Sequence, residues 1–144
     1  MKIMVINGPN LNMLGIREPS HYGTETYKDL IAKIEHHAEK IGAEVLCLQS
    51  NHEGDLLDYI QYAYGLHDGI VINPGAYTHT SIALLDAVKA VGVPTVEVHI
   101  SKVEKREDFR QTSYIRSACI ATITGRGTAG YLEAMDLIKE HIKK

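Results

Sequence analysis

The stretch GIVINPGAYTHTSIALLDAVKAVGVPTVEVHI, residues 69–100, decides the fold of this chain. It opens with an apolar, β-branched run at 69–74 that is typical of a buried strand and ends at Pro74. A helix is predicted over 78–92, and a second strand over 93–100, where Pro94 is tolerated because it lies near the start. Two strands joined through a helix favour a parallel sheet.

The same alternation continues on both sides of this unit. Further strands are predicted at 2–7, 44–49 and 118–124, and further helices at 24–42, 50–65 and 125–144. Thr24 is the predicted N-cap of the first helix and Gly42 its stop. Residues 101–117 are polar and irregular, with room for one helical turn. Five alternating strands favour an α/β, flavodoxin-like, doubly wound parallel sheet of order 2-1-3-4-5 with helices on both faces, in a single domain, 1–144.

The composition excludes several classes of function. A net charge of −3 argues against nucleic acid as a main partner, because binding phosphate backbones needs a basic face. No run approaches the roughly 20 apolar residues of a membrane helix, and the N-terminus lacks the features of a signal peptide. Cys47 and Cys119 lie in apolar runs without a CxxC pair, and we expect both reduced and buried in strands. Together these features predict a cytoplasmic protein without membrane association.

Polar residues gather in four segments that each follow a predicted strand, at 7–23, 50–54, 73–81 and 99–110. The carboxyl ends of parallel strands lie at one edge of a sheet, and ligands bind outside that edge. The first segment is far longer than a usual connection of about 4–6 residues. The turns at the opposite edge are short. This asymmetry predicts a functional edge.

Two pairs of residues in these segments suggest proton transfer. An Arg near a partly buried Tyr stabilises tyrosinate, so Arg17 and Tyr22 form a candidate strong base for a proton beside a carbonyl. His99 ends a strand two residues after Glu97, whose carboxylate would orient the imidazole as an acid. His79 lies at a predicted helix start, where free N–H groups favour anions.

Ordinary structural interpretations exist for the same residues. Asn10 and Asn12 suit turns, Arg17 and Glu18 could form a solvated pair, and a charged run such as 102–110 is usually an exposed face. Thr78 or Thr80 would then only cap a helix at His79. Metal binding is the weaker interpretation of the histidines, because the adjacent His36 and His37 point about 100° apart on a helix.

Two functions therefore remain open from the residues alone. One is a cofactor-free lyase or isomerase that acts on a small polyhydroxylated acid. The other is a flavodoxin-like module that binds FMN or a phosphorylated ligand without catalysis. A flavin site favours stacked aromatic residues, and the chain has one Phe and no Trp.

Six motifs, in order and spacing, resemble those of type II 3-dehydroquinate dehydratases: NGPNLNMLGIREPSHYG (7–23), QSNHEGDLLDYI (49–60), INPGAYTHTSIALLDA (72–87), VPTVEVHIS (93–101), REDFRQTS (106–113) and GRGTAGY (125–131). The resemblance covers essentially the whole chain. It implies the flavodoxin-like fold and the reversible dehydration of 3-dehydroquinate to 3-dehydroshikimate through an enolate, in the shikimate pathway. It also implies no metal or other cofactor, and dodecamers built from trimers.

The resemblance also implies a set of catalytic residues. Tyr22 would remove the C2 proton, and Arg17, on a lid, would activate it. Asn12 would orient a water at the enolate oxygen. His99 would protonate the departing C1 hydroxyl, with Glu97 as its orienting partner.

Substrate-binding roles are implied for a second group. The substrate's hydroxyls and carboxylate would be held by side chains and by two backbone N–H groups, and one residue would reach a neighbouring subunit's site: Asn73, His79 and Arg110 by side chain, Ile100 and Ser101 by backbone, and Asp86 across subunits. Three positions depart from the usual pattern: Lys102 replaces Asn, Ala121 replaces Gly, and Arg126 replaces an apolar residue. None of them replaces a catalytic residue.

Overall fold

The computed structural model describes residues 1–16, 20 and 24–144, and Arg17 and Tyr22 lie outside these ranges. The strands described are β1 (Lys2–Asn7), β2 (Glu44–Gln49), β3 (Gly69–Asn73), β4 (Thr95–His99) and β5 (Ala121–Thr124). The α-helices described are α2 (Tyr27–Ile41), α3 (Glu53–Ala63), α4 (Ile82–Val91) and α5 (Ala129–Lys143). Short 3-10 turns lie between them: η1 (Leu11–Met13), η2 (Gly75–His79), η3 (Val103–Lys105), η4 (Asp108–Gln111) and η5 (Ile115–Ala118).

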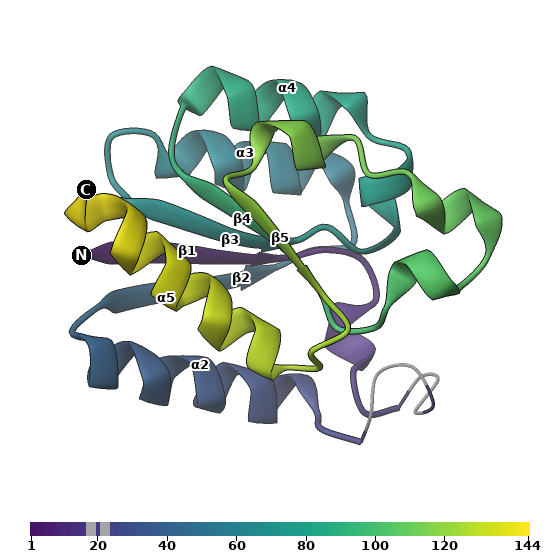
Figure 1. The fold of residues 1–144 in the computed structure, drawn as a ribbon, viewed down its shortest axis with the longest axis horizontal. Helices are drawn as coiled ribbons and strands as arrows, with labels where there is room; N and C mark the ends of the chain where they lie inside the picture. The colour runs from purple at the N-terminus through teal and green to yellow at the C-terminus, as the bar shows by residue number, and fades with distance from the viewer. Residues whose placement is uncertain (17–19, 21–23) are drawn as a thin grey trace.

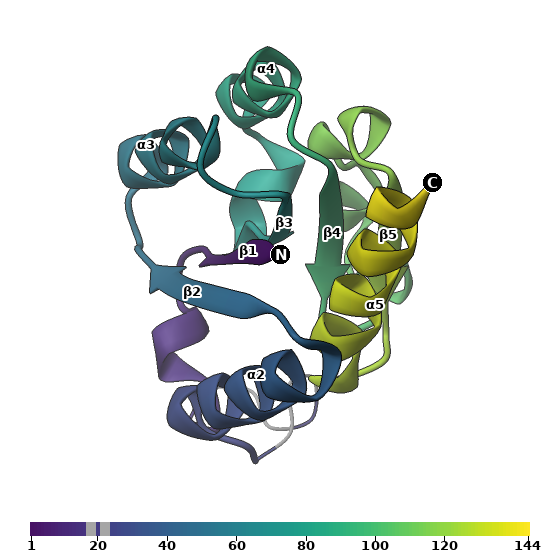
Figure 2. The same cartoon turned by 90° about the vertical axis from the view of Figure 1, so that its left-hand side faces the viewer.

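The five strands form one parallel sheet in the order β2-β1-β3-β4-β5. This order confirms the predicted doubly wound, flavodoxin-like topology. Helices α2 and α5 cover one face of the sheet and α3 and α4 cover the other (Figures 1 and 2). Because the strands are parallel, they all begin at the edge of the sheet that carries the chain termini. They all end at the opposite edge, where the long polar segments lie (Figure 1).

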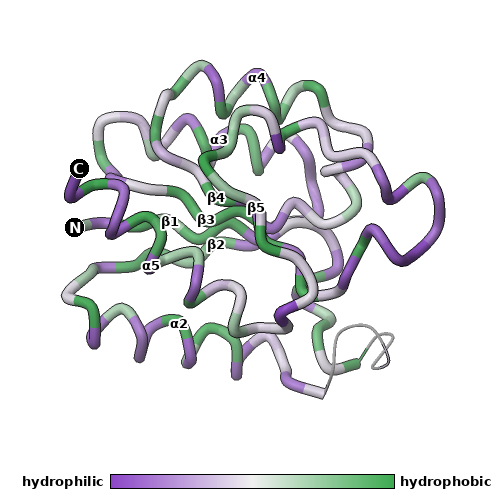
Figure 3. Tube along the Cα trace, viewed as in Figure 1, coloured by the Kyte–Doolittle hydropathy of each residue, from purple (hydrophilic) through white to green (hydrophobic). Residues whose placement is uncertain are grey.

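Alternation along the strands divides the apolar side chains between two cores. In β1, Ile3 and Val5 pack with α2 and α5, whereas Met4 and Ile6 pack with α3 and α4. All four side chains are fully buried. Figure 3 shows the resulting pattern of apolar strands between helices with hydrophilic outer positions, and a hydrophilic run in the segment after β4.

Two predicted helix caps are wrong. Thr26, not Thr24, caps α2, because its hydroxyl accepts a hydrogen bond from the Asp29 backbone N–H while the Asp29 carboxylate accepts one from the Thr26 N–H. Ser81 caps α4 by accepting from the Leu84 N–H, so neither threonine beside His79 serves as the cap. Gly42 ends α2 with φ of 72°, as predicted.

The region before β5 also differs from expectation. Residues 101–117 contribute to three short 3-10 turns rather than one helical turn, and the last of these delays the strand to Ala121. Cys119 therefore lies ahead of the strand, while Cys47 lies within β2. Both thiols are free and half-buried rather than fully buried, and burial raises the pKa of each to about 12.

The exits of β1 and β3 are packed backbone against backbone. The Gly8 N–H donates to the Asn73 carbonyl at 2.7 Å. A Cβ at Gly8 would lie 2.5 Å from the Pro74 carbonyl oxygen, which is too close for any side chain. Gly8 is therefore required to bring these two strand ends together.

We expect Gly8→Ala to lower the free energy of unfolding by about 2 kcal/mol, because backbone rather than a flexible side chain opposes the added methyl group. Gly54→Ala is the matched control. Gly54 lies in α3 with nothing within 4 Å of an added Cβ, so this change should raise the free energy of unfolding by up to about 1 kcal/mol. Urea unfolding measures both, and equal effects would contradict the packing described.

Candidate active site

A cavity opens at the carboxyl edge of the sheet. Three of the four predicted polar segments line it: Pro9, Asn10 and Leu11 after β1; Asn73, Gly75, Ala76 and His79 at and after β3; His99, Ile100, Ser101, Val103, Arg106 and Arg110 at and after β4. The fourth segment, after β2, contacts the first segment: Asn51 Oδ1 accepts a hydrogen bond from the Asn10 N–H at 3.0 Å. The predicted functional edge is therefore a concave site.

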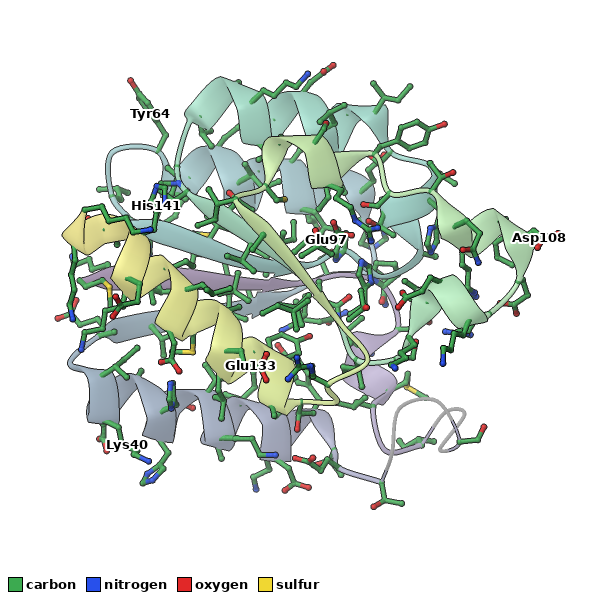
Figure 4. The ribbon with its side chains drawn as sticks, viewed as in Figure 1. Lys40, Tyr64, Glu97, Asp108, Glu133 and His141 are labelled. Atoms are coloured by element: carbon green, nitrogen blue, oxygen red, sulfur yellow. The ribbon has the colours of Figure 1, made fainter. Side chains whose placement is uncertain are left out.

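The end of β4 places an imidazole at the cavity and a carboxylate beneath it. Residues two apart on a strand point to the same face, so Glu97 lies directly behind His99. His99 Nε2 lies 2.5 Å from Glu97 Oε2. Glu97 has no exposed surface, and His99 is 4% exposed. Figure 4 shows Glu97 in the body of the molecule, whereas Asp108 lies at the outer edge.

Several donors surround the Glu97 carboxylate. Oε2 also lies 2.9 Å from the Thr78 hydroxyl and 2.8 Å from the Ser113 hydroxyl, while Oε1 accepts from the Thr122 hydroxyl at 3.2 Å. The Arg116 guanidinium lies 3.5 Å from Oε1. Burial raises the pKa of Glu97, but the hydrogen bond and charge of His99, followed by the two hydroxyls at Oε2, outweigh it and lower the pKa to about 2. Glu97 is therefore ionised at neutral pH.

The ionised carboxylate fixes the tautomer of His99. A carboxylate accepts hydrogen bonds and donates none, so His99 Nε2 must carry the hydrogen of this pair. In the neutral ring Nδ1 then holds the lone pair, and in the charged ring it carries an acidic proton. The pair can therefore exchange a proton with a ligand through Nδ1.

Positive groups form another wall of the cavity. The side chains of Arg106 and Arg110 are only 6% and 17% exposed. Arg110 Nε donates to Glu107 Oε2 at 2.6 Å, and Arg106 Nη1 lies 3.5 Å from Ser101 Oγ. Within the described part of the chain, no Asp or Glu lines the cavity. Glu107 lies 2.6 Å from the Nε of Arg110 and 3.8 Å from that of Arg106, and a guanidinium offers further donors, so the wall suits an anion such as a carboxylate.

His79 lies beside His99 in this cavity. Their rings are nearly parallel, with centroids 6.5 Å apart. His79 Nδ1 donates to the Thr112 carbonyl at 2.6 Å, which leaves Nε2 for a ligand. Burial, the largest cause, lowers the pKa of His79; the hydrogen bond to Thr112 and the charge of Glu97 oppose it, but with the charges of His99 and Arg110 the net effect is a lowered pKa. His79 therefore favours the neutral form, suited to a hydroxyl partner.

The loop after β4 is held by the turn after β5. The Gly125 N–H donates to the Ser101 carbonyl at 3.1 Å, and the Gly127 N–H donates to the Ile100 carbonyl at 3.1 Å. The aliphatic part of Lys102 occupies the space where Gly125 would carry a Cβ. Arg126 pairs with Glu133 at 3.1 Å, away from the cavity lining. Lys102 and Arg126 thus have local partners outside the cavity.

The family model described as Dehydroquinase class II matches residues 1–139. A protein of Clostridium perfringens strain SM101 named 3-dehydroquinate dehydratase is 54% identical over 144 residues, which cover 99% of each chain. One of that name from Corynebacterium glutamicum strain R is 56% identical over 137 residues, 95% of this chain and 94% of the other. The crystal structure of type II dehydroquinase from Butyrivibrio crossotus superposes with a TM-score of 0.95, at 51% identity, covering 96% and 97% of the chains.

The chain belongs to the class II dehydroquinase family. Two of the residues predicted as functional, Asn12 and Asp86, do not line the cavity of this dehydroquinase. Asn12 is exposed on η1, where its Oδ1 accepts from Gln49 Nε2 at 3.4 Å. Asp86 is exposed on α4. The structure brings the others together in or directly behind the cavity, apart from Arg17 and Tyr22, which lie outside the described residues: Asn73, His79, Glu97, His99, Ile100, Ser101 and Arg110.

Arg106 is a cavity residue of the dehydroquinase that was not predicted from the sequence. It lies in a charged run, and such runs usually face solvent. Arg106 follows η3 in extended backbone and Arg110 lies in the separate turn η4, so no helical spacing signals that both line the cavity. Asp108, between them, points outward at the tip of the segment (Figure 4).

The described residues show neither a membrane-spanning helix nor a metal-binding cluster. No helix in the described ranges is long and apolar enough to cross a membrane. No three His, Cys, Asp or Glu side chains of residues 1–16, 20 and 24–144 are grouped so that they could hold a metal ion.

The depressed pKa of Glu97 makes stability depend on pH. Its folded pKa of about 2 lies below the ordinary 4.5, so its contribution is complete above about pH 4.5 and is lost as the pH falls towards 2. Glu97→Gln cannot titrate. We therefore expect this dehydroquinase to lose about 2 kcal/mol more stability than Glu97→Gln between pH 6 and pH 3. Parallel curves of urea midpoint against pH would contradict this assignment.

Proposed function

We propose that this chain catalyses the reversible dehydration of 3-dehydroquinate to 3-dehydroshikimate through an enolate, as a lyase of the shikimate pathway. The observation that carries the proposal is the Glu97–His99 pair at a cavity that two arginines also line, in a chain of this family. The pair supplies an acid for a poor leaving group. The arginines supply a site for the substrate's carboxylate. The 144 residues would act as one catalytic domain.

Substrate binding is the first step. The backbone N–H groups of Ile100 and Ser101, at the end of β4, would hold the carboxylate together with Arg110. Asn73 and His79 would bind the ring hydroxyls from the opposite side. This division follows the charge of the cavity, because the cationic groups come from the segment after β4 and the neutral ones from β3 and η2. The substrate would thus be held in a single orientation.

Proton removal is the second step. Tyr22, as a phenolate stabilised by the Arg17 guanidinium, would take the proton from C2, because the neighbouring ketone acidifies this position only modestly and a strong base is needed. The electron pair of the broken C–H bond moves into the ring to give an enolate. Asn12 would orient a water at the enolate oxygen.

Loss of water is the third step. The enolate reforms the ketone and a C1–C2 double bond develops while the C1–O bond breaks. His99, protonated on both nitrogens, would give its Nδ1 proton to the departing hydroxyl. The products are 3-dehydroshikimate and water, a neutral Tyr22 and a neutral His99. Return of the Tyr22 proton to His99 through solvent restores the starting state, so the reaction needs no metal or other cofactor.

The assembly and location are also proposals. We infer a dodecamer built from trimers, in which Asp86 reaches the site of a neighbouring subunit. The exposure of Asp86 on α4, away from the cavity of its own chain, supports this role. A cytoplasmic location fits a chain with two free cysteines.

The activity is tested by mixing the purified protein with 3-dehydroquinate and following the ultraviolet absorbance of the conjugated enone product. We expect product formation that a strong chelator leaves unchanged. Folded protein without a signal would remove the proposed activity. Loss of the signal with chelator would show that a metal takes part.

The proposed base is tested by two variants. We expect Tyr22→Phe and Arg17→Ala each to lower turnover by about 10²-fold or more, because one removes the base and the other its activating charge. Tyr64→Phe is the control, since Tyr64 is 68% exposed at the end of α3 and away from the cavity. Near-normal turnover of Tyr22→Phe would show that another group takes the C2 proton.

A further inference from the structure

A fully buried phenol connects the ends of two strands beneath the cavity. The Tyr131 hydroxyl donates to Asn7 Oδ1 at 2.6 Å and accepts from Asn73 Nδ2 at 2.9 Å. Asn7 and Asn73 are the last residues of β1 and β3, which pair side by side. Tyr131 has no exposed surface, and Asn73 is 4% exposed and lines the cavity.

Close packing of α5 brings this phenol to the strand ends. Gly130 precedes Tyr131 near the start of the helix, and a Cβ at Gly130 would lie 3.2 Å from an Ile123 methyl group and 3.4 Å from a Val98 methyl group. The helix therefore begins close against β4 and β5. From this position the Tyr131 side chain reaches between the sheet and α2, where it packs in the core with Leu30 and Ile34.

The hydrogen-bond partners of Asn73 fix the orientation of its side-chain amide. Asn73 Oδ1 accepts from the Gly75 N–H at 3.1 Å, and Nδ2 donates to the phenol. The Gly75 N–H can only donate, so the Asn73 oxygen must face it and the Asn73 nitrogen must face the phenol, which accepts one of its hydrogens. A flipped amide would set its oxygen against the phenol oxygen and its NH₂ against a backbone donor. Burial raises the pKa of Tyr131 far above its ordinary value, so the hydroxyl stays protonated.

An amide nitrogen carries two hydrogens, and the phenol takes only one of them. The second is the hydrogen that a ligand hydroxyl in the cavity can accept. We propose that Tyr131 is a positioning residue, which holds the Asn73 amide with this N–H directed at a substrate hydroxyl. This inference rests on the proposed function, in which Asn73 binds the substrate, and adds the element that sets its donor direction.

The test compares Tyr131→Phe with a matched change of packing. Tyr131→Phe keeps the ring but removes one of the two hydrogen bonds that hold the Asn73 amide, leaving only the contact with the Gly75 N–H, so we expect KM for 3-dehydroquinate to rise about tenfold while kcat stays within about threefold. Ile138→Val is the control, because Ile138 is also fully buried on α5. It should lower the urea midpoint without changing KM. If Tyr131→Phe lowers only the midpoint, the role of Tyr131 is structural.

A double variant locates the effect at Asn73. We expect Asn73→Ala to raise KM, and Tyr131→Phe combined with Asn73→Ala to raise it no further, because the phenol then has no amide to orient. Additive increases would contradict the proposal. Activity of the unaltered protein is measured first. Its absence would remove the proposed function, whereas activity with an unchanged KM in Tyr131→Phe removes only this inference.

A measurement on the unaltered chain covers the case in which Tyr131→Phe does not fold. In a ¹⁵N spectrum of the asparagine side chains, the two Asn73 amide protons should be distinct. Quinate lacks the ketone and is not dehydrated. When quinate is added, we expect the resonance of the Asn73 amide proton that faces the cavity to shift. The resonance of the Asn73 amide proton that is hydrogen-bonded to Tyr131 should keep its chemical shift and its slow exchange. Equal shifts of both protons, or a shift of neither, would overturn the proposal.

Discussion

The structure of the site depends on one buried charge, the carboxylate of Glu97. An ionised group without solvent contact is costly unless donors replace its water. Here the donors come from four separate parts of the chain: Thr78 on η2, Ser113 before η5, Thr122 on β5 and His99 on β4 itself. Because these parts must meet for the charge to be tolerated, the carboxylate specifies their relative positions as well as the orientation of the imidazole.

The number of hydrogens makes this arrangement specific. Thr78 and Ser113 lie 2.8 Å from each other and each lies within 3 Å of Glu97 Oε2, yet each hydroxyl has a single hydrogen. The two hydroxyls therefore have two hydrogens for three short oxygen–oxygen contacts. The segment that carries Arg110 is thus tied through Ser113 to the carboxylate that orients His99. The segment with the arginines and the Glu97–His99 pair are therefore connected through one buried network.

Strand order and the location of the site were predictable from the sequence because both follow from local patterns. Apolar periodicity marks the strands and helices, and parallel strands place their following segments at one edge. The spacing of Glu97 and His99 predicted their contact, since a strand turns alternate residues to one face.

The caps at Thr26 and Ser81 were missed because several hydroxyl residues precede each helix and geometry decides among them. The roles of Thr78, Ser113 and Tyr131 as partners of distant side chains, and the inward turn of Arg106, depend on tertiary packing, so no local pattern predicted them.

The central claim is that ionised Glu97 holds the Nε2–H form of His99, leaving Nδ1 to exchange the proton. Two-dimensional ¹H–¹⁵N spectra of the histidine side chains test it most directly. In its neutral form, the His99 ring should show a protonated Nε2 and an unprotonated Nδ1, and Glu97→Gln should shift the Nε2 resonance. A neutral ring with its hydrogen on Nδ1, or an Nε2 resonance that does not respond to Glu97→Gln, would contradict the account.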